Sequence, residues 1–171
     1  MSFFSRLLAP KSTPRDTLRP LWHAVVAVSR EREWYADCGA ADSVEGRFDM
    51  ITVVLALVML RMEDSPALAP DTAPLTEAFV ADMDRQLRDT GVGDLMVGKK
   101  IIKLMGALGG RIGALREGLD ESDAHLATIL ARNVTQTEGA PRFALAVRVR
   151  ALHNALAGLS DYEIRSGVLR V

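Results

Sequence analysis

Apolar side chains recur at intervals of three and four residues along most of the chain, which is the period of an α-helix. Stretches rich in proline, glycine and small polar residues separate these segments, and no hairpin signal is present. The sequence therefore predicts an all-α protein, a single-domain bundle of about six to seven helices. The predicted helices cover approximately residues 18–33, 43–62, 75–89, 95–116, 122–130 and 141–159, followed by a last turn at 160–167.

The predicted helix at about 43–62 differs from the others because apolar residues appear on all its sides. It contains the run MITVVLALVML, from Met50 to Leu60. A helix that is apolar all round belongs in the interior, so we predict a buried central helix. Eleven residues rise only about 16 Å in a helix, so this run is too short to span a bilayer. Asp42 and Glu45 stand at the spacing of a capping box at its start.

The stretch from 82 to 115 predicts the end of one helix, a glycine turn and a second, basic helix. Gly91 stands where a left-handed residue would end the first helix, and Asp94 can cap the second. An apolar seam follows at steps of four and three, formed by Ile101, Met105, Leu108, Ile112 and Leu115. The basic side chains of this helix are Lys99, Lys100, Lys103, Arg111 and Arg116.

The same basic helix is rich in glycine, and each glycine in a helix interior costs about 0.5–1 kcal/mol relative to alanine. The glycines are Gly98, Gly106, Gly109, Gly110 and Gly113. Gly106, Gly110 and Gly113 stand at i, i+4 and i+7 and share one face. One interpretation is close packing of this face against a neighbouring helix of the same domain. The other is a shallow groove that is open to a hydrophobic guest helix.

Charge is distributed unevenly along the chain, although its formal net charge is only −1. Residues 37–84 contain ten acids and two arginines, whereas residues 85–116 contain seven bases and two acids. The basic helix 95–116 is therefore a candidate contact for the phosphate groups of the ribosome or of an anionic membrane surface. The alternative is a solvated face that pairs with the acidic first half of the chain. We expect no DNA partner.

A small apolar face precedes the first predicted helix. It consists of Phe3, Phe4, Leu7 and Leu8. This face is either a frayed tail or an interfacial segment that contacts a membrane or a partner. We therefore expect two parts, a flexible or interfacial segment at 1–15 and a helical domain at 16–171.

No pattern in the chain predicts catalysis or a bound cofactor. His23, His125 and His153 stand on three different predicted helices, with no second metal ligand four residues away. No nucleophile elbow, phosphate loop or catalytic triad pattern is visible. Cys38 is the single cysteine, which excludes an internal disulfide. We expect a protein that is not an enzyme and that holds no metal or cofactor.

Two stretches carry a family resemblance. The first is Trp34-Tyr35, followed by DSVEGRFD at 42–49 and the apolar helix that ends at Leu60-Arg61. The second is DMD at 82–84, then GVGDL at 91–95 and VGK at 97–99, which leads to KLM at 103–105. Their order and spacing, over about residues 18–156, resemble the ubiquinol–cytochrome c chaperone family, the assembly factors of the respiratory cytochrome bc complex. The positions that match are Trp34, Tyr35, Arg47, Phe48 and Asp49 in the first motif, and Asp94, Val97, Gly98 and Lys99 in the second.

The resemblance implies a helical, non-enzymatic chaperone that handles newly made cytochrome b before this subunit joins the complex. Mitochondrial members act beside the ribosome with a small partner protein, whereas the short start and the arginine-rich composition of this chain look bacterial. We therefore expect a cytoplasmic protein that is peripheral to the inner membrane, or a matrix protein if the chain is mitochondrial.

We hypothesise that these nine motif positions, together with Lys103, Gly106, Gly110 and Gly113, bind the partner. Some of the residues receive more specific roles. Arg47 and Asp49 would fix the start of the central helix by charged hydrogen bonds to the loops, and Lys99 and Lys103 would contact the partner. The glycine-lined face would shield a transmembrane helix of cytochrome b, with the basic rim near the ribosome or membrane. The rival hypothesis is a helical domain that binds a lipid or another hydrophobic ligand in an enclosed pocket.

Overall fold

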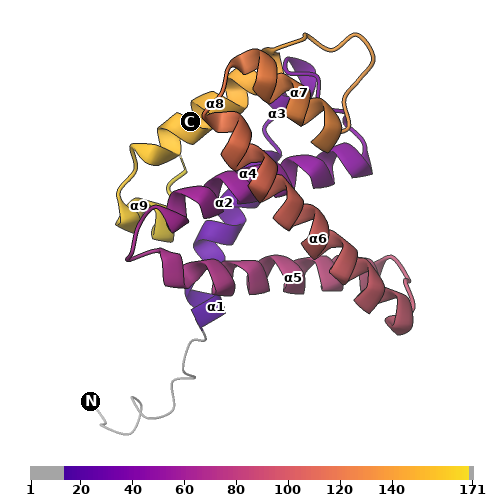
Figure 1. Ribbon diagram of the computed structural model, residues 1–171. Helices are drawn as coiled ribbons and strands as arrows, with labels where there is room; N and C mark the ends of the chain where they lie inside the picture. Colours follow the sequence, from indigo (N-terminus) through magenta and orange to yellow (C-terminus); the bar gives the residue numbers. More distant parts are fainter. Residues whose placement is uncertain (1–13, 170–171) are drawn as a thin grey trace, which may run out of the picture.

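The computed structural model describes residues 14–169, which fold into a bundle of α-helices (Figure 1). Within this range the backbone forms no strand, and an isolated β-bridge joins Ala40 to Gln136. The all-α prediction is confirmed, whereas the predicted face of Phe3, Phe4, Leu7 and Leu8 lies outside the described residues. The helices are α1 (Pro14–Thr17), α2 (Arg19–Ser29), α3 (Arg32–Ala36), α4 (Val44–Glu63), the short 3-10 helix η2 (Ala69–Asp71), α5 (Thr72–Asp89), α6 (Asp94–Leu119), α7 (Asp123–Asn133), α8 (Ala144–Ala157) and α9 (Asp161–Ser166).

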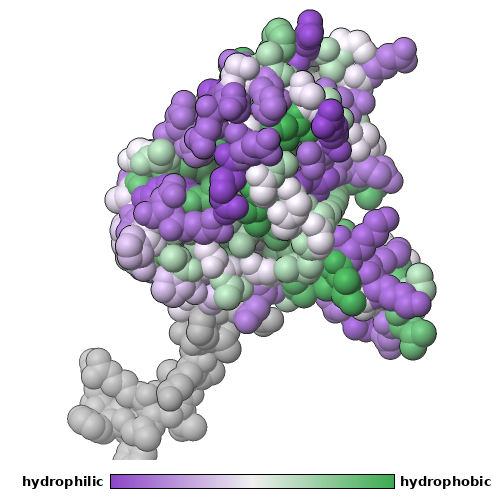
Figure 2. Space-filling model, viewed as in Figure 1, coloured by the Kyte–Doolittle hydropathy of each residue, from purple (hydrophilic) through white to green (hydrophobic). Residues whose placement is uncertain are grey.

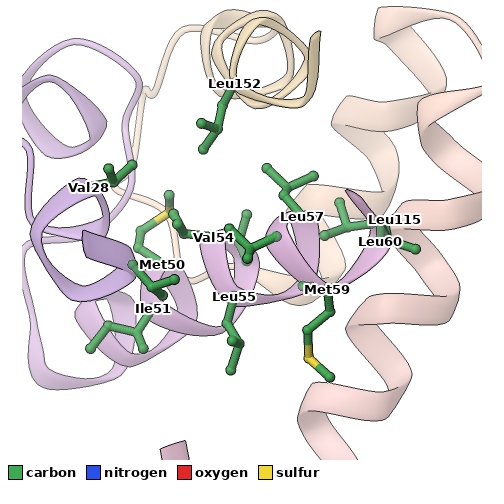
Figure 3. Packing of buried hydrophobic residues seen from close by; sticks show 14 of the residues in the cluster. Val28, Met50, Ile51, Val54, Leu55, Leu57, Met59, Leu60, Leu115 and Leu152 are labelled. Atoms are coloured by element: carbon green, nitrogen blue, oxygen red, sulfur yellow. The ribbon is translucent and has the colours of Figure 1, made fainter. Parts of the chain in front are cut away.

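Helix α4 lies at the centre of the bundle, as its apolar sequence predicts. Every side chain from Met50 to Leu60 is buried. Helices α2, α6 and α8 pack against α4. Figure 3 shows Val28 of α2, Leu115 of α6 and Leu152 of α8 around it. Because burial of one large aliphatic side chain contributes about 1.5–3 kcal/mol, this cluster is the main source of stability.

The start of α4 differs from the predicted capping box. Ser43, with an extended backbone, is the N-cap, and its side chain accepts a hydrogen bond from the backbone N–H of Gly46 at 3.1 Å. Asp42 lies one residue too early for this geometry and pairs with Arg47 at 2.6 Å instead. Gly46 packs tightly under the preceding loop, because a methyl group on it would overlap the carbonyl oxygen of Ala41.

The first predicted helix is divided into α2 and α3 by a turn after Ser29. Two aromatic side chains of α3 reach back across this turn. Nε1 of Trp34 donates to the carbonyl oxygen of Val28, and the hydroxyl of Tyr35 donates to the carbonyl oxygen of Ser29, both at 2.7 Å. These bonds stabilise the end of α2, where carbonyl groups lack partners within the helix.

Helices α5 and α6 form a hairpin whose tip extends away from the rest of the bundle (Figure 1). Gly91 turns the chain with a φ of +78°, which is the left-handed conformation that the sequence predicts. Along α6, Val97 is the one buried residue between 94 and 107, whereas Leu108 and Leu115 are buried in the second half. The second half of α6 is therefore fixed in the core, and the first half leaves most of its surface open.

We expect Gly46→Ala and Gly106→Ala to change stability in opposite directions, although both add a methyl group within a helix. At position 46 the methyl group would overlap the Ala41 carbonyl. Such overpacking is expected to lower the free energy of unfolding by about 1–3 kcal/mol. At position 106 no atom lies within 4 Å. Replacement there is expected to raise the free energy of unfolding by about 0.5–1 kcal/mol. Urea denaturation followed by circular dichroism measures both, and changes of the same sign would contradict these two environments.

Candidate partner-binding surface

The glycines of α6 lie at the surface. Gly98, Gly106, Gly109, Gly110 and Gly113 are all exposed, and a Cβ atom added to any of them would meet no atom of the described residues within 4 Å. The interpretation that this face packs against a neighbouring helix of the same domain is therefore wrong for residues 14–169. A helix whose glycines contact no other element presents bare backbone to whatever approaches it.

Two large apolar side chains continue the glycine face toward the tip of the hairpin. Leu95 is 85% exposed and Ile102 is 75% exposed. At 3.6 residues per turn these two side chains and the five glycines fall within about 120° of arc. We call this set the open face of α6; its members are Leu95, Gly98, Ile102, Gly106, Gly109, Gly110 and Gly113. Figure 2 shows hydrophobic surface beside hydrophilic surface on the projecting end of the hairpin.

Three lysines lie on or near the open face. Lys99, Lys100 and Lys103 are exposed, and none of them forms an ion pair with any carboxylate in the described part of the chain. On the helical wheel Lys99 lies about 40° from Leu95, within the arc of the open face, whereas Lys103 lies about 80° from Leu95, just beyond its edge. Lys100 lies about 140° from Leu95, farther round the helix. The lysines thus form a basic rim that has no internal counter-charge.

Arg111 does not belong to this rim, which corrects its placement on a basic surface. It is 8% exposed and forms an ion pair with Asp49 of α4, which is also 8% exposed. Its guanidinium also donates to the hydroxyl of Thr52 and, at 2.7 and 3.0 Å, to the carbonyl oxygen of Asn133. Asp49 in turn accepts hydrogen bonds from the backbone N–H and the hydroxyl of Thr135, at 2.9 and 2.8 Å.

Arg111 therefore joins α6 to α4 and to the segment that follows α7. Sequence reasoning missed this role, although a signal was present. Arg111 stands three residues after Leu108 and four before Leu115, so it falls on the apolar seam instead of the solvent face. Arg116, by contrast, is exposed and pairs with Glu63. Both arginines pair with the acidic first half of the chain, whereas the three lysines do not.

The first motif does not meet the open face of α6. Trp34 is fully buried, and the Arg148 guanidinium lies 4.6 Å from the centre of its ring. Phe48 is half-buried, with Arg111 5.8 Å from its ring centre. Both charged residues bond to loops, as predicted: Asp49 to the loop after α7, and the exposed Arg47 to Asp42 in the loop before α4. Trp34, Phe48 and Asp49 thus hold the fold together, and they were predicted as partner contacts.

Two residues of the second motif position α6. Gly93 is the N-cap, so Asp94 is the first helical residue and not the predicted cap. Its carboxylate pairs with Arg88, which also bonds to Asp84 at 2.7 Å and lowers the pKa of that carboxyl below its usual value. Val97 is buried. These contacts join the end of α5 to the start of α6, and they leave Gly98 and Lys99 exposed.

The rival hypothesis requires an enclosed pocket. One cleft of about 720 Å³ lies between α2 and α5, with Trp22, His23 and Arg85 in its lining, and a second of about 430 Å³ lies beside Tyr35. Both clefts are open to solvent. No set of three possible metal ligands gathers anywhere in residues 14–169. Among the described helices, none combines the length and the apolarity that crossing a membrane requires.

The family profile described as ubiquinol–cytochrome C chaperone matches residues 36–171. The chain therefore belongs to the ubiquinol–cytochrome c chaperone family. This membership supports a chaperone role in assembly of the cytochrome bc1 complex, and an assembly factor rather than an enzyme.

A solved structure is similar over nearly the whole chain. It is the crystal structure of the Cbp3 homolog from Brucella abortus, with 29% sequence identity and a TM-score of 0.77. The similarity covers 96% of this chain and 94% of that chain. A comparison with curated proteins finds no match.

We expect Arg111→Met to be far more destabilising than Arg116→Met, although both remove an ion pair between α6 and α4. The first leaves the Asp49 carboxylate buried without its cation, which is expected to lower the free energy of unfolding by about 3–5 kcal/mol. The second removes an exposed pair, which is expected to contribute less than about 1 kcal/mol. Urea denaturation of both variants measures the difference, and similar losses would contradict the buried position of Arg111.

Proposed function

We propose that this chaperone shields a transmembrane helix of newly made cytochrome b on the open face of α6. The observation that carries the proposal is the exposure of five glycines on one side of α6, whose second half packs in the core on its other side. Glycine lets two helix backbones approach closely, and small residues at a helix surface favour contact with an apolar helix. Leu95 and Ile102 extend the same face, so an apolar guest would bury them as well.

The basic rim gives the client surface an orientation. Lys99 lies within the open face, Lys103 lies just beyond its edge and Lys100 lies farther round the helix; none of the three has a carboxylate partner within residues 14–169. Cationic side chains beside an apolar helix site favour an anionic neighbour, such as ribosomal RNA or the anionic surface of a membrane. A chaperone for a membrane subunit works where that subunit emerges, so this rim supports a position close to the ribosome and the inner membrane.

Photo-crosslinking tests the identity of the client directly. A benzophenone amino acid at position 102 would stand on the open face, whereas the same group at Tyr162, which is 80% exposed on α9, would stand elsewhere. On irradiation of cells we expect a crosslink to cytochrome b from position 102 and a much weaker one from position 162. Equal yields, or no cytochrome b product from position 102, would reject the proposed surface.

Added bulk on the open face tests whether close approach matters. Gly106→Leu places a large side chain in open space, so we expect the variant to fold but to keep a guest helix at a distance. We expect client affinity to fall at least about tenfold, which corresponds to about 1.4 kcal/mol, so that in cells lacking the natural gene this variant restores much less assembled cytochrome bc complex than the natural chain. Native gels stained for the complex measure its amount.

The matched control is Ala151→Leu, which adds similar bulk at an exposed position of α8. It should restore the complex fully, and immunoblots should show equal amounts of both variants. If Gly106→Leu restores the complex while deletion of the gene abolishes it, the chaperone role stands but the client lies elsewhere.

A further inference from the structure

The residues of the first motif that face solvent line a cleft that the proposed client surface does not use. This cleft, of about 430 Å³, lies beside α3 and the start of α4. Its lining consists of Arg30, Arg32, Tyr35, Ala36, Asp42 and Arg47. The volume falls within the range of about 300–1,000 Å³ that is typical of small-molecule sites.

Charge within the cleft is strongly positive. Three guanidinium groups stand against one carboxylate, that of Asp42, which is already paired with Arg47 at 2.6 Å. The Arg47 hydrogen bond holds the pKa of Asp42 below its usual value, so this carboxylate stays ionised. Arg30 and Arg32 have no carboxylate partner in the part of the chain that the structure describes. Two positive charges in the cleft are therefore uncompensated.

The two acids that flank Arg32 in the sequence are engaged elsewhere. Glu31 pairs with Arg148 at 2.6 Å, and Glu33 approaches the same guanidinium at 3.8 Å. Arg148 itself lies over the ring of Trp34. The segment from Arg30 to Glu33 thus separates its charges, with the two acids directed to Arg148 of α8 and the two arginines left at the cleft.

We propose that this cleft binds a phosphate-bearing anion. A phosphate monoester carries about −1.5 to −2 charges at pH 7, which matches the two uncompensated guanidinium groups. The planar guanidinium donates pairs of hydrogen bonds to phosphate oxygens, and this geometry makes arginine the preferred residue for such groups. Tyr35 forms the wall of the site, because its hydroxyl is held by the carbonyl oxygen of Ser29. The source of the phosphate is either a soluble phosphate compound or the head group of a lipid.

Calorimetric titration of the full-length protein with inorganic pyrophosphate tests the site. We expect binding by the natural chain, and a loss of at least about tenfold in affinity in Arg32→Gln and again in Arg30→Gln/Arg32→Gln. The matched control is Arg132→Gln on α7, because Arg132 is also exposed and has no ion pair within residues 14–169. This control should bind pyrophosphate like the natural chain.

Vesicles distinguish the two sources of phosphate. We would identify a lipid head group if the protein co-sediments with phosphatidylcholine vesicles that contain phosphatidic acid. This co-sedimentation should be lost in Arg30→Gln/Arg32→Gln and kept in Arg132→Gln. Binding of pyrophosphate without such co-sedimentation would identify a soluble anion. No binding of either probe by the natural chain, or equal losses in all the arginine variants, would overturn the proposal. None of these readouts depends on cytochrome b, so the client surface on α6 is tested separately.

Discussion

Helix α4 is apolar on every side, and the bundle is arranged to cover it. Every residue from Met50 to Leu60 is buried, so α2, α6 and α8 must all contact the same short segment. A single helix can be enclosed by only a few neighbours at a spacing of about 8–10 Å. Each neighbour therefore contributes one face to α4 and leaves its opposite face outside. The outer helices also pack on one another, with α6 against α5 and α7, and α8 against α7, but the open face of α6 contacts none of the described helices.

The hydrogen bonds and the ion pair of Arg111 determine which part of α6 packs against α4. Apolar contacts have no direction, so they specify the register between two helices only weakly. The Arg111 guanidinium bonds to Asp49, Thr52 and the Asn133 carbonyl, and these directional bonds define one register. The pair need not increase the net stability, since burial of two charges is costly, but loss of either partner would leave an uncompensated charge. In this register the second half of α6 enters the core, and its first half extends with α5 beyond the bundle (Figure 1).

The elements that sequence reasoning predicted correctly are those with local causes. The apolar run of α4 and the left-handed turn at Gly91 each depend on residues a few positions apart. Some errors are also local, because the predicted caps at Asp42 and Asp94 are each wrong by one residue. The larger errors concern contacts between distant parts of the chain. Arg111 was placed on the surface because its partner, Asp49, is 62 positions away. Likewise, periodicity reveals that the glycines of α6 share a face, but it does not reveal whether another helix covers that face.

The glycines of α6 indicate function because the fold gains nothing from them. Five glycines in a helix cost about 2.5–5 kcal/mol relative to alanine, a substantial part of a typical stability of about 5–15 kcal/mol. Where Gly46 and Gly118 occur, close neighbours explain why no side chain is present, but the five glycines of the open face have no neighbour at all. Because no contact within the described residues offsets this cost in stability, the glycines are consistent with a contact to another molecule. A guest helix that approaches the bare backbone closely would supply the missing packing. The same face continues toward the tip of the hairpin, where Lys99, Lys100 and Lys103 have no carboxylate partner within residues 14–169.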